Sequence, residues 1–395
     1  MSPASKRPRV RDPSPIDWQP VRLAGLELRL LDDPLSRPVQ TSFGTMRSRP
    51  GLLVRLRDQG GREGLGEVWC NFPTGGARYR ATLLAEYAAP ALAGQTFARP
   101  QDLQAALRER LTVLALQCAD CGAIEQILAA LDQAAWDLFC KVLGEPFWRL
   151  MGGKPRVAVY ASGIGPHEVA GTVERQREQG HRWFKLKLGF GDAADHAGIE
   201  AALGVLPQGG RLAVDVNQGW SQEQARVWLP RLAALGIVWC EEPVRADTAW
   251  PAWRALADGA PSMRLAAGEN LLGLESFLHA ITLGGLRVLQ PDLGKWGGIS
   301  GNLELAASWP EGDTWLCPHW LAGGVGLMAS LQFKAVVGGD GPVEVDANPN
   351  RQRSDAFSQE LQVVDGCIEL PQTPGIVPPL SDWLVDPAHW TSHVH

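Results

Sequence analysis

Ionisable residues recur at nearly even intervals through the second half of the chain, each at the end of a short apolar run. Seven successive runs end in such a residue: Lys187, Asp215, Glu241, Glu269, Asp292, His319 and Glu344. The separations are 28, 26, 28, 23, 27 and 25 residues, as expected if one repeating structural unit carries them. Side chains of these types bind cations and move protons, so their chemistry depends on whether the fold gathers them.

Three consecutive carboxylates, Asp215, Glu241 and Glu269, predict a metal site. On adjacent strands their negative charges repel one another unless a cation lies between them. Oxygen ligands favour a hard ion, so we expect Mg²⁺, with Mn²⁺ as the alternative.

Basic groups flank these carboxylates in the sequence. Lys185 and Lys187 are two residues apart, so they share one face of a strand, and each ammonium disfavours protonation of the other. Lys187 is therefore one candidate base. His319 is the second, because Asp292 on the preceding strand can hold its imidazole in one tautomer and raise its basicity. A metal between two opposed bases predicts removal of the proton α to a substrate carboxylate, with the metal stabilising the enolate.

The eight apolar runs between residues 157 and 346 alternate with helix-like segments such as residues 222–236. This alternation implies parallel strands, and the span of 190 residues is close to that of a compact eight-stranded α/β barrel. In a closed barrel the carboxyl ends of all strands face one mouth. An open doubly wound sheet is the alternative, but the turn SGIGPHE after the first strand lacks the dinucleotide-binding fingerprint. The predicted fold class is α/β.

The first 150 residues have a different, α+β pattern. Two alternating segments around a Gly-Gly turn predict antiparallel strands, and residues 102–117 and 122–143 have apolar positions at helical spacing. Residues 1–17 are rich in proline, serine and basic residues without periodicity, which predicts a disordered tail.

Composition excludes several classes of partner. The net charge of −6 provides no general positive potential for nucleic acid. The sequence contains no run of about 18 apolar residues and no signal-peptide core, so we expect no membrane association. Seven cysteines scattered over the chain are typical of reduced thiols, which favours a cytoplasmic location.

Several motifs, in this order along the chain, resemble those of the enolase superfamily, specifically its mandelate racemase-like group (the mandelate racemase/muconate lactonizing enzyme family). They are DQAAWDLFCKVLGEPFWRLMGG, FKLKLGFG, LAVDVNQGW, WCEEPV, AAGEN, LQPDLGKWGGISG and CPHWLAGGVGLMAS, and the resemblance covers residues from about 20 to 380. It implies a modified TIM barrel, (β/α)7β, at residues 151–355 and an α+β capping domain at 18–150. The C-terminal segment, 356–395, is expected to return to the capping domain. A homo-oligomer is also implied.

The resemblance assigns Lys187, the second lysine of KxK, as one base and His319 with Asp292 as the opposing acid/base. Some relatives carry a lysine at the position of Asp292. Counting back from the Gly-Gly pair at 297–298 gives Asp292 the functional position. Lys295, three residues later, is then expected to point to the other face, with little effect on turnover if replaced.

The resemblance also assigns Asp215, Glu241 and Glu269 as Mg²⁺ ligands, with Glu241 preferred to Glu242 because the family ligand is the first glutamate of the pair. Glu344 resembles the carboxyl on strand eight that donates a hydrogen bond to the substrate carboxylate when protonated. The motif VEVD leaves Asp346 open for that position.

The predicted function is Mg²⁺-dependent abstraction of the α-proton of a small-molecule carboxylate substrate, with dehydration of a sugar acid preferred. A racemase or epimerase of a hydroxy acid or amino-acid derivative, and a lactone cycloisomerase, share the enolate step and remain alternatives. A catalytically inactive barrel used for binding is a more distant one. Tyr160, Asn217 and Trp320 are predicted to bind substrate, and the loops 41–48 and 70–77 to close over the mouth.

Overall fold

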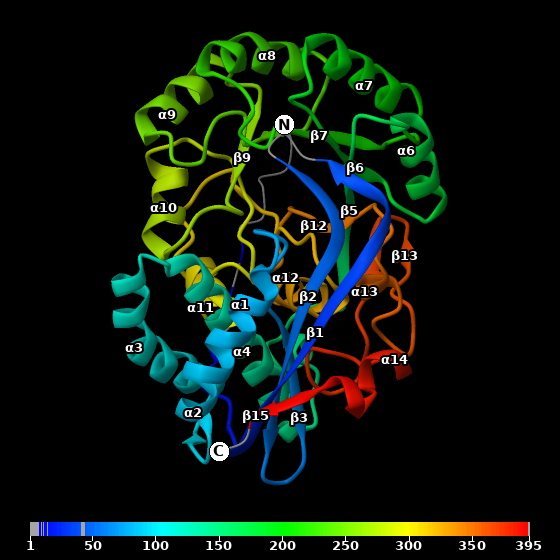
Figure 1. Cartoon of the computed structure of the whole chain (residues 1–395). Helices are drawn as coiled ribbons and strands as arrows, with labels where there is room; N and C mark the ends of the chain where they lie inside the picture. Colours follow the sequence, from blue (N-terminus) through cyan, green and yellow to red (C-terminus); the bar gives the residue numbers. More distant parts are fainter. Residues whose placement is uncertain (1–7, 9, 11, 14, 41–43, 394–395) are drawn as a thin grey trace.

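The computed structural model describes residues 8, 10, 12–13, 15–40 and 44–393, so most of the predicted tail at residues 1–17 lies outside the described residues. A small α+β unit lies against one end of a barrel formed by the second half of the chain (Figure 1).

An antiparallel sheet with helices along one side forms the α+β unit. Its strands are β1 (Val21–Gln40), β2 (Thr45–Asp58) and β3 (Glu63–Glu67), with the short β4 (Thr96–Phe97) beside β1. Leu52, Val54 and Leu56 of β2 are fully buried at every second position, and the residues between them are buried as well, so the middle of this strand is covered on both faces. The helical segments are α1 (Gly76–Leu83), the π-helix Leu84–Ala88, α2 (Ala89–Leu92), α3 (Pro100–Cys118), α4 (Cys121–Leu143) and α5 (Phe147–Leu150).

All eight apolar runs of the second half form strands. These are β5 (Arg156–Ile164), β6 (Trp183–Lys187), β7 (Arg211–Asp215), β8 (Trp239–Glu241), β9 (Arg264–Ala267), β10 (Val288–Leu289), β11 (Trp315–Leu316) and β12 (Val343–Asp346). Neighbours from β5 to β11 pair in parallel, and β12 pairs with β5. The ring closes where the backbone N–H of Glu344 donates to the carbonyl of Pro318 at 3.1 Å. The predicted fold is therefore confirmed.

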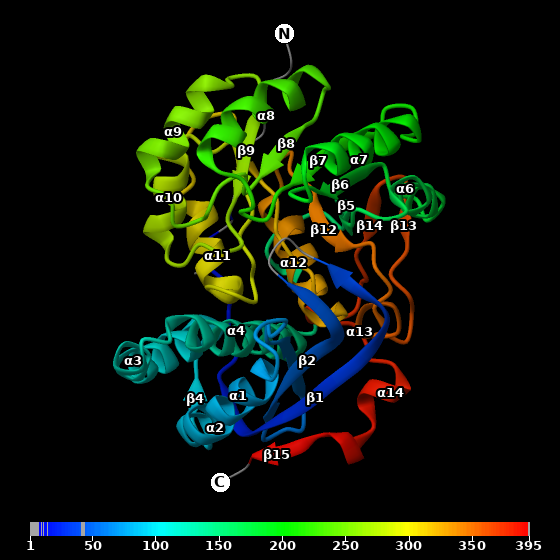
Figure 2. The same cartoon turned by 45° about the horizontal axis from the view of Figure 1, so that its top comes forward.

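Helices cover the outside of the ring (Figure 2). They are α6 (Val169–Glu178), α7 (Asp192–Gly204), α8 (Gln222–Ala234), α9 (Trp250–Gly259), α10 (Leu274–Thr282), α11 (Gly298–Ala307) and α12 (Gly324–Val337). Inside the ring a second, separate cluster of buried side chains fills the end away from the capping domain; it consists of Tyr160, Ala213, Trp239, Ala266, Val288 and Cys317. Side chains fill the interior of the barrel, so the polar side chains at the mouth lie on a packed apolar layer.

The chain after β12 returns to the capping domain. It contains α13 (Arg351–Ser354), β13 (Val363–Val364), β14 (Cys367–Glu369), α14 (Asp382–Val385), the 3₁₀ turn Pro387–His389 and β15 (Thr391–His393). β14 pairs with the start of β5, and β15 pairs antiparallel with β1. The last strand of the chain thus completes the first sheet.

Helix α4 joins the two units directly. Its Trp136 indole N–H donates to the Ser300 hydroxyl of α11 at 2.8 Å, and its Asp132 accepts hydrogen bonds from Ser300. Gly298 has a positive φ of 56°, and a Cβ there would lie 2.5 Å from the Asp132 carboxylate. This close approach requires glycine.

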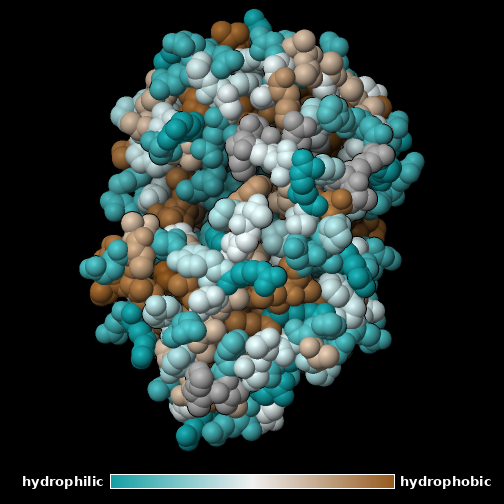
Figure 3. Space-filling view, viewed as in Figure 1, coloured by the Kyte–Doolittle hydropathy of each residue, from teal (hydrophilic) through white to brown (hydrophobic). Residues whose placement is uncertain are grey.

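The face seen in Figure 1 carries mixed hydrophilic and apolar side chains (Figure 3). Apolar groups gather over α3, whose Val113 and Leu116 are exposed. Among the described helices, none combines the length and apolar character needed to cross a membrane.

Candidate active site

A cavity of about 320 Å³ lies between the barrel mouth and the capping domain. The capping domain contributes Met46, Arg49, Trp69, Asn71 and Phe72, and the barrel contributes Gly163, Lys187, Asn217, Gln218, Glu269, Asn270, Lys295, His319, Leu321, Asp346 and Asn348. Lining residues thus come from the loops after most of the barrel strands, as the even spacing in the sequence predicts.

Two lysines from β6 enter the barrel on the same face. The Nζ atom of Lys187 lies 2.6 Å from Oδ2 of Asp215 and lines the cavity. Lys185 is fully buried one layer below, where its Nζ lies 2.5 Å from Oε2 of Glu241 and 2.8 Å from Oε1 of Glu344.

The electrostatic balance at Lys187 differs from the sequence prediction. Burial is the largest influence and by itself lowers its pKa, but the carboxylates of Asp215, Glu241 and Glu269 together outweigh burial and the neighbouring Lys185, so the pKa is raised. The predicted influence of Lys185 is present, but it is weaker than that of the carboxylate in contact with Lys187.

His319 and Asp292 lie side by side at the ends of β11 and β10. The His319 Nδ1 atom is 2.6 Å from Oδ2 of Asp292, and the two residues are paired in register as a parallel bridge. The other oxygen of Asp292 accepts the backbone N–H groups of Gly294 and Lys295 at 2.8 and 3.1 Å. The carboxylate is therefore held in place and fixes the orientation of the imidazole.

The second nitrogen of His319 faces two further carboxylates. Nε2 lies 3.3 Å from Oε2 of Glu269 and 3.5 Å from Oε2 of Glu344. Burial by itself lowers the pKa of His319, but Glu269, Glu344 and Asp292 together raise it to about 9. The imidazole is thus strongly basic in this structure.

The three candidate metal ligands occupy neighbouring positions around the ring. Asp215 and Glu241 are paired in register on β7 and β8, and Glu269 follows β9. Each carboxylate contacts a different lysine: Lys187, Lys185 and Lys295, respectively. In the described part of the chain they do not form a closed ligand cluster.

Their chemistry fits a hard cation. Oε1 of Glu241 is buried without a hydrogen-bond partner among the described residues, and all three groups offer oxygen alone. Burial, followed by the charge of Asp215, raises the pKa of Glu241 to about 7. Glu242 differs, because both of its oxygens accept from the Asn270 amide, at 2.9 and 3.0 Å.

The expectation that Lys295 points to the other face is wrong. Its side chain lines the cavity, with Nζ 2.8 Å from Oε2 of Glu269 and 4.4 Å from the centre of the Trp69 ring. The error arose from treating residues 292–295 as a continuing strand. The Lys295 N–H donates to the Asp292 carbonyl at 3.0 Å, so this segment is a turn, and the alternation of faces ends there.

Replacing Lys295 with methionine will destabilise the Mg²⁺-free protein by about 3–5 kcal/mol, because the buried Glu269 carboxylate loses its partner. If Glu269 is a metal ligand, saturating Mg²⁺ will recover much of this loss, which thermal unfolding with and without Mg²⁺ will show. Lys141→Met, which breaks an ion pair with Asp137 in α4, is the control that Mg²⁺ should not rescue. Equal losses with and without Mg²⁺ for Lys295→Met would remove Glu269 from the ligand set.

Of the three predicted substrate-binding residues, one lines the cavity and two do not. Asn217 lines the cavity and donates its amide N–H to Oδ2 of Asp215 at 3.2 Å. Tyr160 does not, because it lies deeper in the ring against Trp239. Trp320 is also outside the lining, since its indole N–H donates to the Gly323 carbonyl and its ring packs against neighbouring glycines. These two predictions are corrected to packing roles.

Glu344 contacts the buried Lys185 inside the ring. Asp346 is two residues later on β12, so its side chain lies on the same face of the strand. Glu344 lies in the lower layer, where Lys185 and His319 outweigh burial and lower its pKa. It contacts Lys185 and His319 and does not line the cavity. Asp346 lies at the mouth, lines the cavity and pairs with Arg49 of the capping domain.

Sequence reasoning found part of the capping-domain wall and missed Arg49 and Trp69. The predicted loops 41–48 and 70–77 do contribute Met46, Asn71 and Phe72, although residues 41–43 lie outside the described residues. No regular spacing in the sequence marks Arg49 or Trp69 as a site residue. They line the cavity because the capping domain contacts the barrel there.

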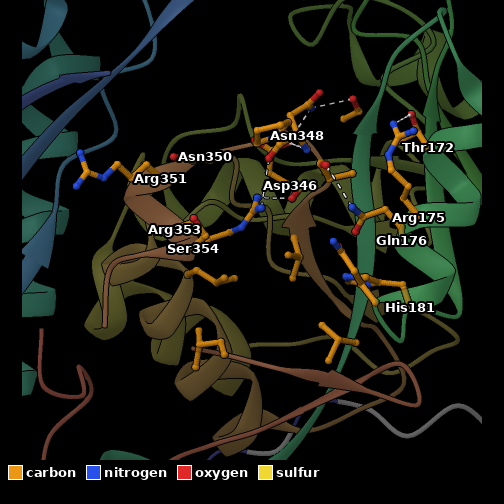
Figure 4. A pocket seen from close by; sticks show the side chains of 18 of the residues that line it. Thr172, Arg175, Gln176, His181, Asp346, Asn348, Asn350, Arg351, Arg353 and Ser354 are labelled. Carbon is orange, nitrogen blue, oxygen red and sulfur yellow. Dashed lines mark hydrogen bonds between the residues drawn. The ribbon is translucent and has the colours of Figure 1, made fainter. Parts of the chain in front are cut away.

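A larger cavity of about 1910 Å³ lies outside the ring, between α6 and the segment after β12. Figure 4 shows Arg175 and Gln176 on one wall and Arg353 on the other, with Asp346 and Asn348 between them. It shares Gly163, Asp346 and Asn348 with the mouth cavity, but no predicted catalytic residue or metal ligand lines it.

A closed parallel barrel with opposed basic groups and an oxygen-only carboxylate set at its mouth defines a class of metal-assisted proton-transfer enzymes. Residues 26–152 match the mandelate racemase / muconate lactonizing enzyme N-terminal domain, and residues 168–377 match the enolase C-terminal domain-like family. The chain belongs to the mandelate racemase/muconate lactonizing enzyme group of the enolase superfamily, and it is an enzyme.

Similar curated proteins catalyse several reactions. An N-succinylamino acid racemase of Thermus thermophilus is 31% identical over 90% of this chain and 94% of its own length. A D-galactarolactone cycloisomerase of Agrobacterium fabrum is 28% identical over 90% and 96%. A D-galactonate dehydratase of Cronobacter sakazakii is 32% identical over 52% of this chain and 56% of its own length.

Solved structures agree on the fold. A mandelate racemase/muconate lactonizing enzyme from Bordetella bronchiseptica RB50 is 38% identical, with a TM-score of 0.83 and coverage of 93% of this chain and 99% of that one. An enolase from Bradyrhizobium, complexed with magnesium and mandelic acid, is 26% identical, with a TM-score of 0.79 and coverage of 94% and 99%. Mg²⁺ is the typical cofactor of this group, which confirms the predicted cofactor.

Proposed function

We propose that the enzyme removes the α-proton of a sugar acid and then eliminates water from it. The observation that carries this choice of substrate is the lining of the cavity. Five residues with amide side chains line it, namely Asn71, Asn217, Gln218, Asn270 and Asn348. Their side chains also hydrogen-bond within the protein, as Asn217 does with Asp215 and Asn270 with Glu242. An amide both donates and accepts hydrogen bonds, which matches the hydroxyl groups of a polyol chain.

Asp215, Glu241 and Glu269 are proposed to hold the Mg²⁺. When bound, Mg²⁺ supplies positive charge that stabilises the negative charge developing on the substrate carboxylate. Holding the cation requires the three carboxylates to turn from their lysine partners toward a shared centre.

Lys187 and His319 are proposed to move the protons. They line one cavity from β6 and from the end of β11, which lie on opposite sides of the ring. Lys187, in its neutral amine form, takes the α-proton on one face, and His319, held by Asp292, donates a proton to the departing β-hydroxyl. The capping-domain side chains over the mouth exclude water from this step.

Racemisation or epimerisation is the second candidate. The placement of Lys187 and His319 on opposite sides of one cavity favours it, because each can serve one face of the same α-carbon. This reaction needs no leaving group, so the two functions differ in the product and not in the first step.

Proton NMR in D₂O distinguishes them. The Mg²⁺-loaded protein is incubated with hexarates, aldonates, hydroxy acids and N-acyl amino acids, beside His319→Asn. A deoxy keto acid product supports the dehydratase. Loss of the α-proton signal with an unchanged carbon skeleton supports the racemase, and no reaction across the sugar acids overturns the proposed substrate class.

A further inference from the structure

One segment of the capping domain, residues 67–71 at and after the end of β3, contacts the barrel at every second residue. Glu67 accepts backbone N–H groups at the start of α12, Trp69 stacks on the Lys295 ammonium, and Asn71 donates to the Leu321 carbonyl at 2.9 Å. Three contacts within five residues fasten this segment to the barrel.

These contacts fall beside the His319–Asp292 pair. Leu321 is two residues after His319, and Lys295 is three after Asp292. The Gln133 side chain of α4 adds a further link, because it accepts the Glu67 backbone N–H at 3.2 Å and donates to the Leu293 carbonyl at 3.1 Å.

Glu67 makes the most specific of these contacts. It is 2% exposed, and its two oxygens accept the N–H groups of Gly323 at 2.6 Å and Gly326 at 2.9 Å. A carboxylate at a helix N-terminus satisfies unpaired N–H groups and is favoured by the helix dipole. A Cβ at Gly323 would lie 2.6 Å from Glu67, so this approach also depends on glycine.

Only residues 320–322 separate His319 from Gly323, the residue that Glu67 binds, and hydrogen bonds of Trp320 hold this short segment. Trp320, next to His319, donates its indole N–H to the Gly323 carbonyl at 2.7 Å and its backbone N–H to Glu344 at 3.3 Å. A shift of Gly323 therefore moves the backbone that carries the imidazole.

Lys187 has no comparable attachment. In the described structure, residues 183–191 form hydrogen bonds and ion pairs with other parts of the barrel, such as Asp215, Glu241 and Asp195.

We propose that Glu67 is a positioning residue for the His319–Asp292 pair, so that the capping domain controls one of the two proton-transferring groups and leaves Lys187 unaffected. This inference rests on the proposed function for its catalytic consequence, but the geometry itself can be tested without a substrate.

The first test is NMR of ¹⁵N-histidine-labelled, Mg²⁺-loaded full-length protein, with the His319 ring signals assigned from His319→Asn. In Glu67→Gln the new side-chain NH₂ group replaces one of the two oxygens that accept the Gly323 and Gly326 N–H groups. We therefore expect the His319 ring signals and their pH titration to change, while the signals of the other histidines stay the same. Glu63→Gln is the matched control, because Glu63 lies on the same strand but pairs only with Arg55 and Arg57. If Glu67→Gln does not fold, Glu67→Asp, which keeps the charge and shortens the reach, replaces it. Wild-type His319 signals in a folded Glu67 variant overturn the proposal.

The second test follows α-proton exchange in D₂O and product formation with a compound that the substrate panel identifies. Glu67→Gln should slow the step that uses His319 at least tenfold; this step is loss of the β-hydroxyl in a dehydration, or exchange on the His319 face in a racemisation. Exchange through Lys187 should change less than twofold, and equal losses at both steps overturn the proposal. If wild-type protein exchanges no compound, the proposed function fails, whereas the NMR result still decides the positioning role.

Discussion

Lys187→Ala will lower the rate of α-proton removal on its face of the substrate by about 10³-fold or more, because its amine is the group proposed to accept that proton. In the proposed dehydration His319→Asn will instead block loss of the β-hydroxyl, and in a racemisation it will stop exchange on the opposite face. Exchange of the α-proton into D₂O, measured with each epimer, reports the two faces separately.

The control for this experiment is Lys154→Ala, an exposed lysine away from the mouth, which should exchange at the wild-type rate. Circular dichroism establishes that Lys187→Ala is folded, since the replacement leaves Asp215 without its lysine. If a folded Lys187→Ala retains exchange on both faces, the base must be assigned elsewhere, and Lys295 is then the first alternative because its ammonium lines the same cavity.

Removing the metal will abolish activity, and adding Mg²⁺ will restore it. Glu241→Gln should weaken Mg²⁺ binding by more than about 100-fold, because loss of a direct ligand exceeds the 10–100-fold effect typical of groups that merely support one. Isothermal titration of the chelator-treated protein with Mg²⁺ measures this directly.

The adjacent pair of glutamates supplies its own control. Glu242→Gln should weaken Mg²⁺ binding much less, because Glu242 is already satisfied by the Asn270 amide. The opposite result, with Glu242→Gln severe and Glu241→Gln mild, would transfer the ligand role to Glu242. Mn²⁺ is expected to replace Mg²⁺ in binding, since both prefer oxygen ligands.

The contact between the two units also shapes the cavity. Arg49 and Asp346 form a buried ion pair across the mouth, and Asn348 donates to the other oxygen of Asp346 at 2.8 Å. This arrangement holds polar groups at the end of the cavity opposite the candidate metal ligands. It is consistent with a substrate that carries hydroxyl groups beyond its reacting carbon.

Local sequence was sufficient for the barrel and for the order of its polar residues. Each strand is a short apolar run, and a parallel barrel places every strand end at one mouth, so regular spacing predicts convergence. The neighbours Lys187, Asp215 and Glu241, each the last residue of its strand, could be placed in this way. The pairing of His319 with Asp292 followed from the adjacency of their strands.

The sequence by itself therefore determined the fold, the kind of site and the order of its chemical groups around the ring, because these depend on periodicity and on which strands are neighbours. The tertiary structure alone decided the rest. A turn after Asp292 brings Lys295 to Glu269, and the packing of the capping domain brings Glu67, Arg49 and Trp69 to the mouth. Such contacts join residues far apart in the chain through irregular backbone, where no repeating period relates position in the sequence to direction in space.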